Sequence, residues 1–171
     1  MFPKLASQET INFVTNPHKF EIANGVEFLG TSGRNMHDIQ LYSKPAPEDP
    51  SEEKKEDTET SYADQLKRLL EQRHLCPTAP DTLRCFPFST DDPFVIERSP
   101  DVMFAGCQPS YSEQLIYQHK KTKESAVKII SVPTFALTRS IVLVDLETLE
   151  SYELSFGDRL VLEKEEQKVE E

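Results

Sequence analysis

The stretch Pro77–Pro109, which reads PTAPDTLRCFPFSTDDPFVIERSPDVMFAGCQP, sets the architecture of this chain. It holds six of the 12 prolines, and proline fixes φ and lacks a backbone donor, so most of the stretch cannot be a helix or a central strand. It also carries nine large apolar residues, too many for a disordered linker. We therefore expect an ordered, extended segment pinned across a core, which leads into a short buried strand, Val102–Ala105, that ends at Gly106.

The residues before this stretch predict the start of a sheet. The alternating, β-branched run Thr10–Thr15 indicates a strand that ends at Asn16-Pro17. Phe20–Ala23 and Val26–Leu29 flank Asn24-Gly25, a pair that accepts the positive φ values of a type I′ turn. A β-hairpin is therefore expected here, followed by the loop at Gly30–Gly33.

Two helices are expected after the hairpin. The first is short and covers Arg34–Tyr42. The second covers Tyr62–Gln72, with Ser61 or Thr60 as its cap, and its apolar residues recur at i, i+4, i+7 and i+8. These residues are Tyr62, Leu66, Leu69 and Leu70. The stripe predicts packing onto a sheet, with a groove for a partner helix as the alternative.

Acidic stretches lie between the helices and at the C-terminal end. Ser43–Thr60 has three prolines, ten charged residues and nothing apolar larger than Ala46. Such a composition cannot bury enough surface to offset the ordering entropy, so residues 44–60 are expected to form a disordered acidic loop. A phosphorylated or partner-binding segment is the alternative. Residues 158–171 are expected to form a charged flexible tail.

The residues after the central stretch predict further strands. These are Gln114–Gln118, Ala126–Val132, Ser140–Asp145 and Ser151–Phe156. Together with the earlier elements they indicate an antiparallel β meander preceded by helices, which is an α/β sandwich rather than a doubly wound sheet. Residues 1–43 and 61–157 are expected to be parts of one domain.

Composition narrows the possible functions. The net charge is −11, but residues 44–59 and 158–171 contribute most of it, so the remaining chain is only mildly acidic. A mildly acidic domain is a poor candidate for the main phosphate-binding surface of a nucleic-acid protein. No run of 18 apolar residues occurs, so no membrane-spanning helix is predicted. Cys76, Cys85 and Cys107 are odd in number and lack CxxC spacing, which indicates reduced thiols rather than disulfides or a zinc site.

The titratable residues suggest no catalytic, cofactor-binding or metal-ligating group. The histidines are His18, His37, His74 and His119, and no pair has a metal-binding spacing. The acidic residues near the central stretch are Asp81, Asp91, Asp92 and Asp101. Asp81 follows Pro80 and is typical of a turn or cap rather than a general base. No phosphate-binding glycine loop and no Ser/His/Asp ordering occurs.

Two separated patches of sequence resemble one family. The first comprises Pro77–Leu83, Phe86-Pro87-Phe88, Asp92-Pro93-Phe94 and Gly106-x-x-Pro109. The second comprises Val14–Pro17, Gly25-Val26, Phe28–Asn35 and Asp38-Ile39. The two patches, in the order in which they occur along the chain, resemble the B subunits of the eukaryotic replicative DNA polymerases. Within that family they resemble the delta branch. The resemblance extends over about Phe2 to Phe156 except for the acidic insertion.

The resemblance implies the C-terminal half of a calcineurin-like, phosphoesterase-type β-sandwich with flanking helices. Metal-binding relatives carry ligand histidines in the loops that match Thr31–Arg34 and Gly106–Pro109. Here the matching positions are Ser32, Cys107 and Pro109. Pro109 has no ligand atom, Ser32 is a poor neutral ligand, and one thiolate cannot rebuild a binuclear site of hard ligands. We therefore expect that the metal site is lost.

The resemblance also implies a non-catalytic accessory subunit. It would bind the cysteine-rich C-terminal domain of a polymerase catalytic subunit and a further accessory subunit, contact DNA only indirectly or weakly, and act in the nucleus during DNA replication. Asn16-Pro17 and Gly30–Asn35 are the candidate surface loops. The alternatives are a B subunit of polymerase alpha or epsilon, and an active metal-dependent phosphoesterase or nuclease. Since few helices are available to cover the apolar strands, these 171 residues are not expected to be a stable domain alone.

Overall fold

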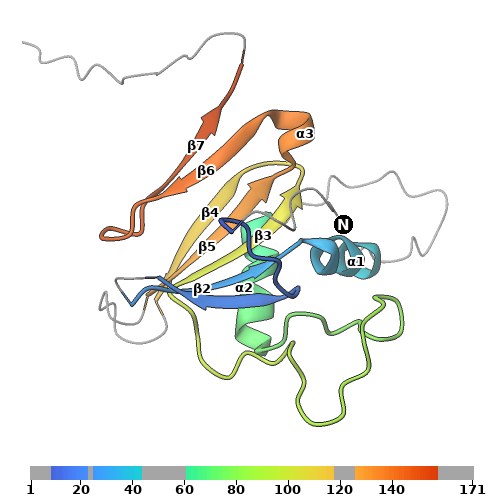
Figure 1. Cartoon of the computed structure of the whole chain (residues 1–171). Coiled ribbons are helices and arrows are strands. Elements are labelled where there is room, and N and C mark those ends of the chain that lie inside the picture. Colours follow the sequence, from blue (N-terminus) through green and yellow to red (C-terminus); the bar gives the residue numbers. More distant parts are fainter. Residues whose placement is uncertain (1–8, 23–24, 44–60, 118–125, 158–171) are drawn as a thin grey trace, which may run out of the picture.

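The computed structural model describes residues 9–22, 25–43, 61–117 and 126–157. A five-stranded sheet of order β1-β2-β3-β5-β4 forms the centre, and β6 and β7 form a separate hairpin (Figure 1). The elements are β1 (His18–Glu21), β2 (Glu27–Thr31), α1 (Arg34–Ser43), α2 (Tyr62–Gln72), β3 (Val102–Gln108), β4 (Ser112–Tyr117), β5 (Ala126–Pro133), α3 (Phe135–Thr138), β6 (Ser140–Val144) and β7 (Ser151–Ser155). No described helix is long and apolar enough to cross a membrane. The expected acidic loop 44–60 and tail 158–171 lie outside the described residues.

The N-terminal hairpin is confirmed, but its turn and its preceding strand are not. Ile22 N donates to Val26 O at 3.1 Å and Gly25 N to Ile22 O at 2.8 Å. Gly25 has the positive φ, 78°, that was expected of it, but the first residue of the expected type I′ turn, Asn24, lies outside the described residues. The strand expected at Thr10–Thr15 is wrong: these residues are exposed and irregular. Among the described residues β1 pairs only with β2, and no strand is placed to pair with Thr10–Thr15.

The three central strands of the sheet run parallel. β2 pairs parallel with β3, and β3 pairs parallel with β5. The expected antiparallel meander is therefore wrong here, although β4 with β5 and β6 with β7 do pair antiparallel. Parallel neighbours need a crossover of a dozen or more residues, and residues 32–101, with α1 and α2, form the crossover between β2 and β3. The fold is a mixed α/β arrangement.

β3 is longer than the expected strand Val102–Ala105. It continues past Gly106 to Gln108, and its register to β5 shifts between Ala105 and Gln108. Cys107 has φ 54° within this interval. Such a shift marks a β-bulge, in which an extra residue lets the strand resume pairing. The strand therefore continues past Gly106 instead of ending there.

α2 covers one face of the sheet, as its apolar stripe predicts. The Ser61 side chain accepts a hydrogen bond from Ala63 N at 3.3 Å and so caps the helix. The buried residues of α2 are Ala63, Leu66, Leu69 and Leu70. They share one core with Leu29, Met103 and Ile129 of the three parallel strands. The stripe is therefore core packing.

Residues 77–101 form an ordered segment without a helix or a sheet strand, as expected, but residues 77–82 form turns and are not extended. In Figure 1 they run as a long loop between the end of α2 and β3. Leu75 N donates to Phe94 O at 2.8 Å, and Ile96 N donates to Arg73 O at 2.9 Å, so the segment is held to the end of α2. The buried side chains of Phe94 and Ile96 anchor it in the core.

A second contact holds this segment to α1. The Asp38 carboxylate accepts hydrogen bonds from the hydroxyls of Thr78 and Thr82, the latter at 2.6 Å. These two bonds lower the pKa of Asp38. The start of the proline-rich segment is thus fixed to a helix about 40 residues earlier in the chain.

The β6–β7 hairpin packs on the opposite face of the sheet. Phe28, Val102 and Ile130 form the buried part of this second core, with Val142 and Val144 of β6 packed against them. The hairpin leaves other apolar side chains exposed, including Leu143 and Tyr152. The instability expected of the isolated chain stays a prediction.

A half-buried ion pair between β4 and β5 is linked to the hairpin through Ser151 of β7. Lys128 Nζ lies 2.6 Å from Glu113 Oε2, and the Lys128 side chain is only 7% exposed. Ser151 Oγ and the Tyr111 hydroxyl, the latter at 2.7 Å, donate to the same oxygen. Burial disfavours the Glu113 carboxylate, but the hydrogen bonds from Lys128, Ser151 and Tyr111 prevail and lower its pKa. Burial also raises the pKa of Tyr111 to about 12.

We predict that Glu113→Gln destabilises the intact protein at neutral pH by about 1.5–3 kcal/mol, because it removes hydrogen bonds to a charged group. The folded-state pKa of Glu113 lies below its ordinary value of 4.5. Its contribution is therefore present above about pH 4.5 and is lost as the pH falls through the folded-state pKa. Thermal unfolding at pH 7 and at acidic pH checks this: the difference from wild type should shrink in acid.

Glu153→Gln is the matched control, since Glu153 is an exposed carboxylate on β7. It should leave the unfolding midpoint unchanged at both pH values. An equal effect of the two variants would contradict the assigned role of Glu113.

Candidate functional site at the ends of the parallel strands

Three loops meet at one edge of the sheet. The carboxyl ends of the parallel strands β2 and β3 lie at the same edge, where open α/β sheets place ligands. Thr31–Arg34 follows β2, and Gly106–Pro109 ends β3. Because β1 is antiparallel to β2, Asn16-Pro17 also lies at this edge, directly before β1. All three loops were expected from the sequence to be candidate surface or ligand loops.

Asn16 joins the loop before β1 to the loop Thr31–Arg34. Its Nδ2 donates to Ser32 Oγ at 2.9 Å, and its Oδ1 accepts from Ser32 N at 2.9 Å. The two candidate surface loops, Asn16-Pro17 and Gly30–Asn35, are therefore in direct contact. Both hydrogen bonds use groups of Ser32 that a ligand would otherwise contact.

Gly33 allows the loop Thr31–Arg34 to lie close against the loop Gly106–Pro109. It has φ 84°, and a Cβ added to it would lie 1.9 Å from Gly106 O and 2.3 Å from Gln108 Nε2. Gln108 Nε2 in turn donates to Gly106 O at 2.8 Å. Only glycine permits this approach of the two backbones, and the approach fills the space between the loops.

Buried polar groups fix the same loop to the end of α2. Thr31 Oγ1 donates to Asn35 Oδ1 at 3.1 Å, and Asn35 Nδ2 donates to Leu75 O at 2.8 Å. Gly33 N donates to Thr31 Oγ1 at 3.3 Å. From the sequence Asn35 was expected in a surface loop, whereas it is buried, because a bond to a carbonyl 40 residues away leaves no local signal.

The three positions that the resemblance matches to metal ligands are Ser32, Cys107 and Pro109. Ser32 is half-buried, whereas Cys107 and Pro109 are exposed. Within the described residues, no three His, Cys, Asp or Glu side chains are grouped so that they could hold a metal ion. His18 stacks on Phe20 with ring centroids 5.6 Å apart, His37 is exposed on α1, and His119 lies outside the described residues.

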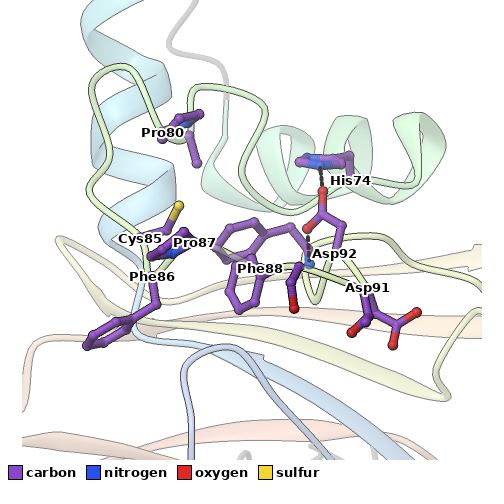
Figure 2. A pocket seen from close by; sticks show the side chains of 12 residues that line it. His74, Pro80, Cys85, Phe86, Pro87, Phe88, Asp91 and Asp92 are labelled. Carbon is purple, nitrogen blue, oxygen red and sulfur yellow. Dashed lines mark hydrogen bonds and ion pairs between the residues drawn. The ribbon is translucent and has the colours of Figure 1, made fainter.

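His74 lies in a different place, at an open hollow of 460 Å³ beside the segment 77–101 (Figure 2). Its Nε2 is 3.2 Å from Asp92 Oδ2. Cys76 N donates to His74 Nδ1 at 3.3 Å, so the proton of the neutral imidazole is on Nε2. Asp92 Oδ1 accepts from Phe94 N at 2.8 Å, and this bond, followed by that from His74, lowers the pKa of Asp92.

The remaining residues considered from the sequence are structural or solvated. Asp81 and Asp91 are exposed. Asp101 Oδ2 accepts from Glu27 N at 2.8 Å and so joins the start of β3 to β2. Burial raises the pKa of Cys76 to about 12, which keeps this thiol protonated and unreactive at neutral pH.

Comparisons with known proteins match most of the chain to subunits of DNA polymerases. A family profile that describes the B subunit of DNA polymerase alpha/epsilon matches residues 1–113. The DNA polymerase delta small subunit of Arabidopsis thaliana is 39% identical over 160 residues, which is 94% of this chain and 32% of the relative. That of Saccharomyces cerevisiae is 38% identical over 155 residues (85% and 31%). DNA polymerase delta subunit 2 of Drosophila melanogaster is 32% identical over 157 residues (92% and 32%). The chain thus spans about a third of the length of these relatives.

We predict that Gly33→Ala is more destabilising than Gly25→Ala. Both glycines have positive φ, which costs an alanine about 1–2 kcal/mol. The space around Gly25 is open, with the nearest atom 3.9 Å from an added Cβ, whereas Gly33 meets the Gly106 backbone. Gly33→Ala should therefore cost a further amount of about 1–3 kcal/mol, measured by urea or thermal unfolding of the intact protein. Equal losses in the two variants would show that the contact between the loops is not tight.

Proposed function

Because the chain belongs to the family of DNA polymerase alpha/epsilon B subunits, we propose that it forms part of the accessory small subunit of DNA polymerase delta. One observation carries the choice of polymerase: 94% of the chain aligns, at 39% identity, with a protein named DNA polymerase delta small subunit. The yeast and fly relatives are also named for polymerase delta. A B subunit of polymerase alpha or epsilon remains the alternative that the family description allows.

We propose that the protein has no catalytic activity of its own. Its frame would be a phosphoesterase-type sandwich from which the metal site has been lost. The parallel core with loops at one edge is compatible with such a frame. Ser32, Cys107 and Pro109 at that edge offer one hydroxyl, already bonded to Asn16, and one exposed thiol. A pair of hard divalent ions would need several further oxygen or nitrogen ligands.

The proposed role is assembly. The partners would be the C-terminal domain of the catalytic subunit and a further accessory subunit, in the nucleus, with DNA contacted indirectly or weakly. The overall charge of −11 supports protein partners over nucleic acid as the main ligand. We also propose that residues 1–43 and 61–157 are parts of one domain.

Purification of the intact, tagged protein from its own cells tests the assignment. We expect the catalytic subunit of polymerase delta to co-purify in stoichiometric amount and to remain bound in moderate salt. Recovery of the catalytic subunit of polymerase alpha or epsilon instead would overturn the choice of polymerase. Recovery of none of the three would overturn the proposed function.

Hydrolysis assays test the absence of catalysis. With Mn²⁺ or Mg²⁺, the intact protein should not hydrolyse bis(p-nitrophenyl) phosphate or single-stranded DNA above the background of a mock preparation. Ser32→Ala and Cys107→Ala are the diagnostic variants, because they alter the positions that match metal ligands. Hydrolysis by the wild type that either variant abolishes would refute the loss of the metal site.

A further inference from the structure

Phe86 is 86% exposed, and the residues around it from 84 to 93 are also exposed, apart from the half-buried Cys85. A single exposed aromatic residue needs no explanation by itself. Phe86, however, is followed by Pro87 and by the partly exposed Phe88, and all three residues line the open hollow. In Figure 2 the Phe86 ring points away from the other labelled side chains, at one end of the row that they form.

The apolar floor of the hollow is anchored rather than loose. Phe88 packs edge-on against Phe94 with ring centroids 5.9 Å apart. Phe94 is buried and its carbonyl accepts from Leu75 N. Pro80 and Pro87, which also line the hollow, restrict the backbone on either side. These restrictions on Phe88 and on the two prolines reduce the conformational entropy that this part of the loop loses when a ligand binds.

The other end of the hollow is acidic. Asp91 and Asp92 are exposed, and in Figure 2 Asp91 lies at the opposite end of the row from Phe86. Asp92 is held in place by Phe94 N and His74. Two adjacent carboxylates next to an apolar floor complement a lysine or arginine and repel a phosphate backbone.

We propose that the hollow between Phe86 and Asp91 is a docking site for an extended segment of a partner protein. The segment places an apolar side chain against Phe86 and Phe88, and a lysine or arginine close to it in sequence against Asp91 and Asp92. This occupant is chosen because the carboxylates of the rim complement a basic side chain and the aromatic floor complements an apolar one. The inference goes beyond the proposed function, since it does not depend on which polymerase the protein serves.

The first test selects peptides on the intact protein. The probe is a phage-displayed library of random 12-residue peptides, selected on the wild type and counter-selected on Phe86→Ala. Enriched peptides should contain an apolar residue close to a lysine or arginine. Their Kd should rise at least about tenfold in Phe86→Ala, as for an aromatic hot spot, and up to about fivefold in Asp91→Asn, as for an exposed ion pair.

Leu137→Ala is the matched control, because Leu137 is 82% exposed and lies on α3, outside the hollow. It should leave Kd unchanged, and neither Phe86→Ala nor Leu137→Ala should shift the thermal midpoint, since both side chains are exposed. Enrichment of acidic peptides, no difference between wild type and Phe86→Ala, or equal weakening by Leu137→Ala would overturn the proposal.

The second test identifies the occupant in cells. p-Benzoylphenylalanine is placed at position 86, or at position 137 as control, of the intact protein in its native complex, and photo-crosslinked peptides are sequenced. Position 86 should crosslink to another polypeptide at a segment with an apolar residue beside a lysine or arginine. A crosslink only to another part of the same polypeptide, a crosslink to DNA, or no crosslink would overturn the proposal. The co-purification experiment above tests the polymerase assignment separately.

Discussion

The parallel pairing of β2, β3 and β5 is the constraint from which the rest of the fold follows. β3 lies between the other two strands, so its side chains are buried on both faces: Met103 packs under α2, and Val102 packs under the β6–β7 hairpin. Parallel sheets require such cover on both faces. The chain must also return to the starting edge before each parallel strand, which makes the long crossover 32–101 a requirement of the topology. The proline-rich segment completes that return without forming a further strand.

The same topology creates the site at the strand ends. Because β2 and β3 are parallel, the loops that follow them are neighbours, although about 70 residues of sequence separate them. Their side chains and backbone then decide what the edge can do. Gly33 lies close against Gly106, and Asn16 bonds to the hydroxyl and the backbone N–H of Ser32. At this edge, where open α/β sheets place ligands, the first contacts of the loops are therefore with one another.

Local signals predicted the local elements, and they could not predict strand direction. The bounds of α2 and its Ser61 cap follow from a helical stripe and one hydroxyl, and the hairpin follows from the glycine at position 25. Alternation reports which side chains are buried, but it is the same in parallel and antiparallel strands, so the meander was wrong. The bulge at Cys107 depends on the register to β5, which no neighbouring residue encodes. The candidate loops were found from sequence, whereas the bonds between them join distant residues and could not be.

The two surface features differ in a way that bears on function. The strand-end loops are joined to one another by hydrogen bonds and a close backbone contact. The hollow at Phe86 instead presents an aromatic side chain and carboxylates to solvent. Within it, the contact of Phe88 with the buried Phe94 and the fixed φ of Pro80 and Pro87 restrict part of the surface. The strand-end loops are thus held by contacts within the chain, whereas the side chains of the hollow face solvent, and this difference is the physical basis for proposing the hollow rather than the strand ends as a docking surface.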